Sequence, residues 1–315
     1  MSRTRHFDPS GRRVAVLHGG QSNERPVSIR TGEAVLRALA DRPCTVIPLD
    51  FGPDSTRELI DARPDVVFIA LHGGLGENGA VQGLLECMGV PYTGSGVLAS
   101  ALAMDKIRSK RIFEACGVPT PDWWIARPDD PPPENGWPWV VKPSREGSSV
   151  GVRIVDDARD WAAALREGTS GDGELLVERC ITGRELSVVL LDGEVLGTVE
   201  IRPAEGVYDF EAKYVRQDTE YLCPAPISGA EASAVERAAQ QAWNALGCRG
   251  VGRVDVMLGE GPDEPRPWVL EANTVPGLTE TSIVPRVAAH RGWSFADLVW
   301  TMLGSATRDG EGGEA

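Results

Sequence analysis

The chain has 315 residues, 42% of them hydrophobic and 25% charged, a composition typical of a soluble globular protein of two or three domains. Its formal net charge of −14 argues against a nucleic-acid partner, because proteins that bind nucleic acids present a basic surface. No apolar run approaches the length of a membrane span, and the basic segment 1–13 precedes an apolar run too short for a signal peptide, so we expect a cytoplasmic protein without a membrane partner.

The first third of the chain alternates strand and helix patterns. Apolar runs predict buried strands at 12–20, 44–50 and 65–74. Helical spacing predicts helices at 28–40 and 80–89, the second closed by Gly89. Such alternation indicates a parallel α/β sheet, in which ligands bind beyond the carboxyl ends of the strands. Both glycine loops, "HGGQSNER" (18–25) and "HGGLGENG" (72–79), fall at those ends.

The remaining two thirds mix helices with strands. Helices are predicted at 100–117, 161–168 and 229–247, and strands at 139–144, 152–157, 174–181, 252–258 and 267–274. Two β-runs around Asp192 and Gly193 predict a hairpin. Residues 206–228 lack periodicity and are interpreted as a long ordered loop, and the segment from 304 onward as disordered.

The six cysteines are scattered and form no CxxC pair. This spacing favours free buried thiols in a reducing cytosol over a disulfide framework or a zinc site.

Charged and amide side chains lie close together on the last two predicted strands. Because side chains alternate along a strand, Arg253 and Asp255 share one face, and Glu271 and Asn273 share another. If the strands pair, two carboxylates and an amide oxygen converge, which are ligands suited to Mg²⁺. A surface hairpin with solvated charges is an equally open interpretation of this spacing.

The segment "VVKPSREGSSVG" places Lys142 at the end of a buried strand and a Gly/Ser loop after it. The lysine can present its charge to a phosphate, and the loop can bring backbone N–H groups close. An ordinary turn with a lysine reaching to solvent is the alternative. No GxxxxGK[ST] motif is present, so a nucleotide site here would not be a P-loop.

From about Arg13 to about Leu303 the chain resembles the D-alanine–D-alanine ligases of the ATP-grasp superfamily. The resemblance rests on an ordered set of motifs: "HGGQSNERPVS", "ALHGGLGENGAVQG", "PYTGSGVLASALAMDK", "VKPSREGSSVGV", "YDFEAKY", "GRVDVM" and "LEANTVPGLT". It implies an α/β chain with an N-terminal parallel, Rossmann-like domain followed by a two-subdomain α+β ATP-grasp fold. The implied boundaries are a disordered tail at 1–12, the N-terminal domain at 13–99, subdomains at 100–182 and 183–304, and a disordered tail at 305–315.

The resemblance also implies an ATP site between the two subdomains. Lys106, Lys142 and, on a lid, Lys213 match residues that contact phosphates, and the loop of Ser148 and Ser149 closes over them. Adenine is read by the segment matching Glu178, Arg179 and Ile181, largely through backbone, and Glu185 matches the ribose ligand; without the resemblance both acids would be interpreted as surface charges. The matches to Asp255, Glu271 and Asn273 hold two Mg²⁺ or Mn²⁺ ions.

The D-alanine sites follow from the same resemblance. Glu24 matches a residue that faces the ammonium of the first D-alanine, with His72 near it, although a helix dipole alone would favour an acid at Glu24. Ser282 and the Ile283 backbone match the site for the carboxylate of the second D-alanine. The resemblance assigns stabilisation of the oxyanion to Arg253 and the Gly277 N–H, and assigns Tyr214, on the lid, a hydrogen bond with Glu24 and Ser148.

The implied activity is ATP-dependent formation of D-alanyl-D-alanine through an acylphosphate, for cell-wall synthesis, by a homodimer whose partners are D-alanine and ATP. In D-alanine–D-lactate ligases the lid tyrosine is often replaced by histidine, so Tyr214 favours the dipeptide. Another ATP-grasp carboxylate–amine ligase and an inactive homologue remain alternatives. A Rossmann dehydrogenase would need a GxGxxG motif after the first strand, where the chain has "HGGQSNE".

Overall fold

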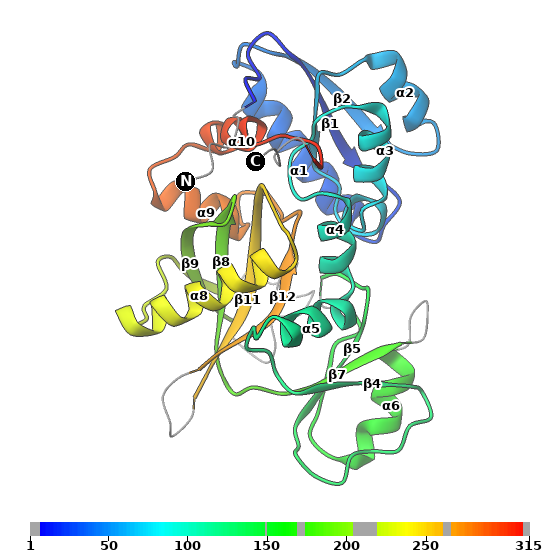
Figure 1. Ribbon diagram of the computed structural model, residues 1–315, viewed down its shortest axis with the longest axis vertical. Coiled ribbons are helices and arrows are strands. Elements are labelled where there is room, and N and C mark those ends of the chain that lie inside the picture. Colours follow the sequence, from blue (N-terminus) through cyan, green and yellow to red (C-terminus); the bar gives the residue numbers. More distant parts are fainter. Residues whose placement is uncertain (1–6, 149, 169–173, 204–218, 261–265, 311–315) are drawn as a thin grey trace.

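The computed structural model describes residues 7–148, 150–168, 174–203, 219–260 and 266–310, and these form three sheets (Figure 1). The strand orders are β2-β1-β3, β4-β7-β5-β6 and β10-β9-β8-β11-β12. The sheets follow one another along the chain, each with its own hydrophobic core on at least one face. The domain boundaries that the resemblance implies remain a prediction.

The N-terminal sheet is parallel, as the alternating pattern predicted. Its strands are β1 (Arg13–Gly19), β2 (Thr45–Phe51) and β3 (Val66–Ile69). Its helices are α1 (Arg25–Leu39), α2 (Ser55–Ala62), η1 (Gly74–Gly76) and α3 (Ala80–Met88). Gly89 ends α3 in a left-handed conformation, with φ of 71°. The glycine loops after β1 and β3 lie side by side because these two strands are neighbours in the sheet.

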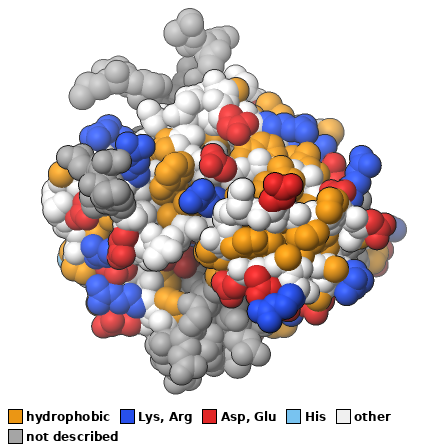
Figure 2. Space-filling model, turned by 90° about the horizontal axis from the view of Figure 1, so that it is seen from below, with side chains coloured by type: hydrophobic (Ala, Val, Ile, Leu, Met, Phe, Trp, Pro, Cys, Tyr) orange, Lys and Arg blue, Asp and Glu red, His pale blue; other side chains and the backbone are white. Residues whose placement is uncertain are grey.

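The middle sheet is antiparallel and carries a small aromatic core. Its strands are β4 (Trp123–Ala126), β5 (Trp139–Pro143), β6 (Arg153–Val155) and β7 (Leu175–Arg179), with α6 (Ala158–Gly168) packed on one face. Trp139 and Trp161 are buried between this helix and the sheet. Figure 2 views the molecule from this end, where hydrophobic side chains lie among acidic and basic ones.

The last sheet contains the predicted hairpin. Its strands are β8 (Gly183–Leu191), β9 (Glu194–Arg202), β10 (Glu220–Leu222), β11 (Val251–Gly259) and β12 (Arg266–Asn273), with α8 (Gly229–Ala245) packed on one face and α9 (Ile283–His290) and α10 (Phe295–Gly304) following in the chain. Asp192 and Gly193 both have positive φ, which confirms the tight turn. The prediction of a continuous loop at 206–228 is wrong at Glu220–Leu222, which pairs with β9 as an edge strand.

The helix predicted at 100–117 is two helices, α4 (Val97–Met104) and α5 (Lys106–Ala115). Asp105 separates them because its backbone is extended, with φ of −95° and ψ of 98°, and its side chain accepts the Arg108 N–H as the N-cap of α5. The apolar face of α5 packs beside α8 through Phe113, so this helix adjoins the five-stranded sheet although it precedes the middle sheet in the chain.

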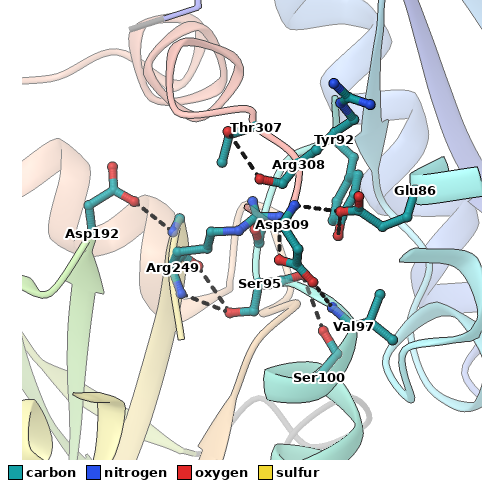
Figure 3. A network of polar contacts seen from close by, with 12 residues as sticks. Glu86, Tyr92, Ser95, Val97, Ser100, Asp192, Arg249, Thr307, Arg308 and Asp309 are labelled. Carbon is teal, nitrogen blue, oxygen red and sulfur yellow. Dashed lines mark hydrogen bonds and ion pairs between the residues drawn. The ribbon is translucent and has the colours of Figure 1, made fainter. Parts of the chain in front are cut away.

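The predicted disordered tail differs from the structure over residues 305–310. Thr307 forms an antiparallel bridge with Tyr92, and the Asp309 carboxylate accepts the Val97 N–H at the start of α4, 2.9 Å away (Figure 3). Arg249, just before β11, lies 3.4 Å from Asp309 and stacks over the Tyr92 ring. These contacts hold residues 305–310 in place. The sequence did not predict this order, because the segment is polar and has no hydrophobic periodicity. At the other end, the Phe7 N–H donates to Gly304.

All six cysteines are free, but Cys87 and Cys116 are exposed, where buried thiols were expected. Cys87 lies on the outer face of α3, and Cys116 caps the C-terminus of α5. No helix in the described part of the chain is both long and apolar enough to cross a membrane.

Candidate active site

A cavity of about 590 Å³ lies between the middle and the last sheet. One part of its lining is apolar: Val140, Ile154, Ile181, Met257 and Leu270. The lining also includes these predicted site residues: Lys106, Lys142, Ser148, Glu178, Arg179, Glu185, Asp255 and Glu271. Strand alternation could have found two of the apolar residues that sequence reasoning missed, because Val140 is two positions from Lys142 and Met257 two from Asp255.

A second, smaller cavity of about 50 Å³ lies at the glycine loops of the N-terminal sheet. Its lining includes Glu24, His72, Arg253, Asn273 and Gly277. The two cavities share lining residues: Lys106, Glu146, Gly147, Ser148 and Glu271. A group bound in one cavity therefore lies next to a group bound in the other.

The wall of the small cavity is built by close contacts between loops. The Ser22 hydroxyl donates to the His72 carbonyl, 2.6 Å away, and joins the two glycine loops. The Ser148 hydroxyl donates to the Glu24 carboxylate from the loop after β5. Gly73 has φ of 68°, and a Cβ there would lie 2.5 Å from the Glu24 carboxylate, so this position requires glycine.

His72 is buried, with its ring held on both sides. Its Nε2 lies 2.9 Å from the Thr31 hydroxyl, and its Nδ1 lies 3.1 Å from the Val275 carbonyl. The Glu77 carboxylate is 3.7 Å from Nδ1. The imidazole is thereby fixed at the edge of the small cavity, where it can orient a ligand or a neighbouring loop.

The predicted pairing of the last two strands is confirmed. Asp255 is opposite Glu271, and Arg253 is opposite Asn273. The Nε of Arg253 lies 3.1 and 3.2 Å from the two Asp255 carboxylate oxygens, and Ser187 also donates to Asp255. The Asn273 side-chain oxygen accepts the Val275 N–H at 3.0 Å.

These donors fit Mg²⁺ in chemistry, because they are hard oxygens from adjacent strands and both carboxylates line the large cavity. The described residues contain no group of three or more His, Cys, Asp and Glu side chains able to hold a metal ion. A metal here would therefore depend on the two carboxylates together with the amide and the phosphates of a ligand.

Lys106 begins α5 at the junction of the two cavities. Its ammonium donates to the Glu146 carbonyl at 2.7 Å and lies 3.3 Å from Glu271. Its backbone N–H donates to the Ser144 carbonyl, 2.9 Å away. The loop that follows β5 is therefore attached to the start of α5.

Asp105 strengthens this attachment, and sequence reasoning missed it. Its carboxylate accepts hydrogen bonds from the Ser144 hydroxyl at 3.0 Å and from Arg145 Nε at 2.8 Å. Burial raises the pKa of Asp105, but these hydrogen bonds, with that of the Arg108 N–H, hold it below its ordinary value. An aspartate inside a predicted helix was the available signal, because aspartate favours caps over helix interiors.

Two residues expected at the second D-alanine, Ser282 and Ile283, lie at the start of α9. The Ser282 hydroxyl accepts a hydrogen bond from the Thr279 N–H. It also lies close to Gly277, because a Cβ built on Gly277 would be 3.0 Å from the Ser282 hydroxyl oxygen. The Ile283 side chain is buried in the core, so only its backbone is available for the expected role. Neither residue lines the two cavities described above. Ser149, Lys213 and Tyr214 lie outside the described residues.

The sequence-family model for the C-terminus of D-Ala–D-Ala ligases matches residues 112–304, and the family model for their N-terminus matches residues 54–95. The chain belongs to the D-alanine–D-alanine ligase family. Similar members of this ligase family include D-alanine–D-alanine ligases from Anaeromyxobacter sp. (strain Fw109-5), 48% identical over 94% of this chain and 97% of the relative, and from Pseudomonas putida (strain GB-1), 42% identical over 92% of each.

Solved structures of this ligase family have the same fold. The D-alanine–D-alanine ligase from Bacillus anthracis superposes with a TM-score of 0.82 at 34% identity, covering 94% of this chain and 97% of that one. A structure of the Bacillus anthracis ligase complexed with ATP gives 0.81 at 32% identity with the same coverage. The expected α/β fold, an N-terminal parallel domain followed by an ATP-grasp fold, is confirmed, and the two later sheets prove to be antiparallel.

Proposed function

We propose that this ligase joins two D-alanine molecules to D-alanyl-D-alanine, converting ATP to ADP and phosphate. Family membership supports the reaction, and one structural observation supports its course: the large and small cavities share Lys106, Ser148 and Glu271 in their walls. A nucleotide in the first would therefore direct its terminal phosphate toward an amino acid in the second. This is the arrangement that transfer of a phosphoryl group to a carboxylate requires.

ATP fits the large cavity by the chemistry of its lining. Its apolar part, formed by residues such as Val140 and Met257, suits a purine, with Glu178 to Ile181 along one side. Glu185 lies where ribose hydroxyls can donate to it, and Lys106 and Lys142 supply positive charge for the phosphates. These two lysines offset a phosphate charge that an acidic protein would otherwise repel.

The first D-alanine is assigned to the small cavity. Glu24 would accept from its ammonium, and His72 would help to hold it. Its carboxylate oxygen attacks the γ-phosphorus, the bond to ADP breaks, and an acylphosphate forms. Phosphorylation makes the carboxyl carbon a good electrophile, because phosphate leaves where an oxide would not. The loop of Ser148, held against Glu24, limits access of water to this intermediate.

The second D-alanine then attacks through its neutral amine. Ser282 and the Ile283 backbone are assigned to its carboxylate, and Arg253 and the Gly277 N–H to the oxyanion of the tetrahedral intermediate. That intermediate collapses to the dipeptide as phosphate leaves. The roles of Ser149, Lys213 and Tyr214 as a lid stay predictions from the sequence.

Asp255, Glu271 and Asn273 are the residues that would hold Mg²⁺ or Mn²⁺. A bound divalent ion would neutralise charge on the phosphates. The interaction of Lys106 with Glu271 and of Arg253 with Asp255 keeps these carboxylates in place on their strands.

A homodimer and a cytoplasmic location complete the proposal. The homodimer is supported by the family resemblance alone, and light scattering after size exclusion would test it. The six free cysteines and the need for ATP fit a reducing cytoplasm.

Phosphate release, with mass spectrometry of the product, tests the proposal. We expect release to require ATP, D-alanine and a divalent ion together, and the product to be D-alanyl-D-alanine. Parallel reactions contain L-alanine alone, or D-alanine with D-lactate. Equal turnover with L-alanine would show that the substrate assignment is wrong, and a preference for the ester would identify a D-alanine–D-lactate ligase.

A further inference from the structure

Three charged side chains form a row between α5 and the middle sheet. Glu178, on β7, is buried and has an ammonium group on each side. Lys142, on β5, donates to its Oε1, and Lys110, on α5, lies 2.8 Å from its Oε2. Two cations therefore surround one anion at the edge of the large cavity.

The two lysines differ in what else they contact. Lys142 lines the large cavity. Lys110 does not, and its side chain is fully buried. Its ammonium has two further acceptors, the Thr120 hydroxyl at 2.5 Å and the Val269 carbonyl at 3.3 Å. The ion pair with Glu178 and the hydrogen bonds to these two oxygen atoms hold the Lys110 ammonium within the protein, away from the large cavity.

Because Glu178 is paired with two lysines, it can lose one of them and still keep a partner of opposite charge. Burial raises the pKa of Glu178, and the ammonium groups of Lys110 and Lys142 overcome this effect and keep the carboxyl ionised. If Lys142 turned from Glu178 to a phosphate in the cavity, Glu178 without another cation would be an unpaired buried charge, which is strongly unfavourable.

We propose that Lys110 is a positioning residue for ATP: it remains paired with Glu178 when Lys142 leaves to bind phosphate. Lys110 thus acts through Glu178 and touches no substrate. It makes Lys142 available at low cost, and it keeps the Glu178 carboxylate ionised as an acceptor beside the purine. The inference rests on the proposed function, in that ATP occupies the large cavity.

The test is a double-mutant cycle of Lys110→Met and Glu178→Gln, with ATP affinity in the presence of Mg²⁺ measured by calorimetry. We expect Lys110→Met alone to weaken ATP binding by about ten-fold or more, as loss of a charged contact would. In the Glu178→Gln background we expect the same change to have less than about a three-fold effect, because no carboxylate is left to hold. The KM for D-alanine should stay within about two-fold of wild type.

Arg111→Met is the matched control, since it removes a positive charge from the exposed neighbouring position of α5 and should leave ATP affinity unchanged. Equal weakening by Lys110→Met in both backgrounds would overturn the proposal, as would equal rises in the KM values of ATP and D-alanine. If the Lys110→Met variant does not fold, the Glu178→Gln variant and the double variant are compared for ATP affinity. A ten-fold difference in ATP affinity between these two would show that Lys110 acts by another route and would overturn the proposal. Formation of D-alanyl-D-alanine by the wild type tests the proposed function separately.

Discussion

Ser148 donates a hydrogen bond to Glu24, although 124 positions separate the two residues in the sequence. Ser148 follows β5 of the middle sheet, and Glu24 precedes α1 of the N-terminal sheet. The backbone of Ser148 has φ of 51°, a left-handed conformation that is uncommon outside glycine. The contact therefore joins the wall of one cavity to the wall of the other through a residue held in an unfavourable conformation.

Ser148→Ala should lower kcat/KM for D-alanine by about ten- to a hundred-fold, because a hydrogen bond to a charged group contributes about 1.5–3 kcal/mol. Steady-state assays at saturating ATP measure this. Ser233→Ala, on the exposed face of α8, is the control. Wild-type kcat/KM for Ser148→Ala would show that the contact has no part in the reaction.

Glu271→Gln should reduce turnover by about a hundred-fold or more, because it removes a charge opposite Asp255 and beside Lys106 while keeping the side-chain shape. The melting temperature should change little, since Glu271 contributes no apolar core. Glu220→Gln, on the edge strand β10, should be neutral in both assays. Full activity of Glu271→Gln at ordinary Mg²⁺ concentration would remove Glu271 from the site.

Asp105→Asn should destabilise the protein by about 2 kcal/mol at pH 7, because the charged hydrogen bonds with Arg145 and Ser144 are lost. The pKa of Asp105 is lowered in the folded protein, so its stabilisation is complete above the unfolded value of about 3.9 and is lost as pH falls below it. Urea unfolding at pH 7 and near pH 3 should show the difference between wild type and variant narrowing in acid. An unchanged difference would assign the effect to packing.

Asp309→Ala should lower the free energy of unfolding by about 1 kcal/mol, as removal of a helix N-cap does, because the Val97 N–H loses its acceptor. The Asp309 carboxylate also lies beside Arg249, so the loss should diminish in high salt. Thermal unfolding at low and high ionic strength measures both effects. Asp61→Ala, an exposed aspartate on α2, serves as the control, and a shift no larger than this control would refute the assignment.

Local patterns predicted much of this molecule where the physics itself is local. Asp255 lies opposite Glu271, as the two-residue period of side chains along paired strands predicts. The turn at Asp192 and Gly193 follows from the positive φ that aspartate and glycine accept. The break at Asp105 is different, because helix-forming residues continue on both sides of it. The local signal was the preference of aspartate for helix caps, whereas its further partners, Ser144 and Arg145, are brought close only by the folded chain.

The junction of the two cavities could not be predicted from the residues alone. It depends on how the three sheets are placed, which brings Lys106 and Ser148 beside Glu271. The partners of Lys110 were equally hidden: Thr120 and Val269 are ordinary residues in the sequence, and their oxygen atoms matter only because of where the chain folds. The same is true of Thr307 and Tyr92, which lie far apart in the sequence.

The packing of α10 on α1 has a consequence for the order of events during translation (Figure 1). Val16 and Leu39 of the N-terminal unit share a hydrophobic core with Val299 and Leu303 of α10. A ribosome makes the chain at about 5–20 residues per second, so α1 and the core that it shares with β1 wait many seconds for α10. During that interval the nascent chain exposes an apolar surface that chaperones recognise, and its first strands complete their packing only after α10 has left the ribosome.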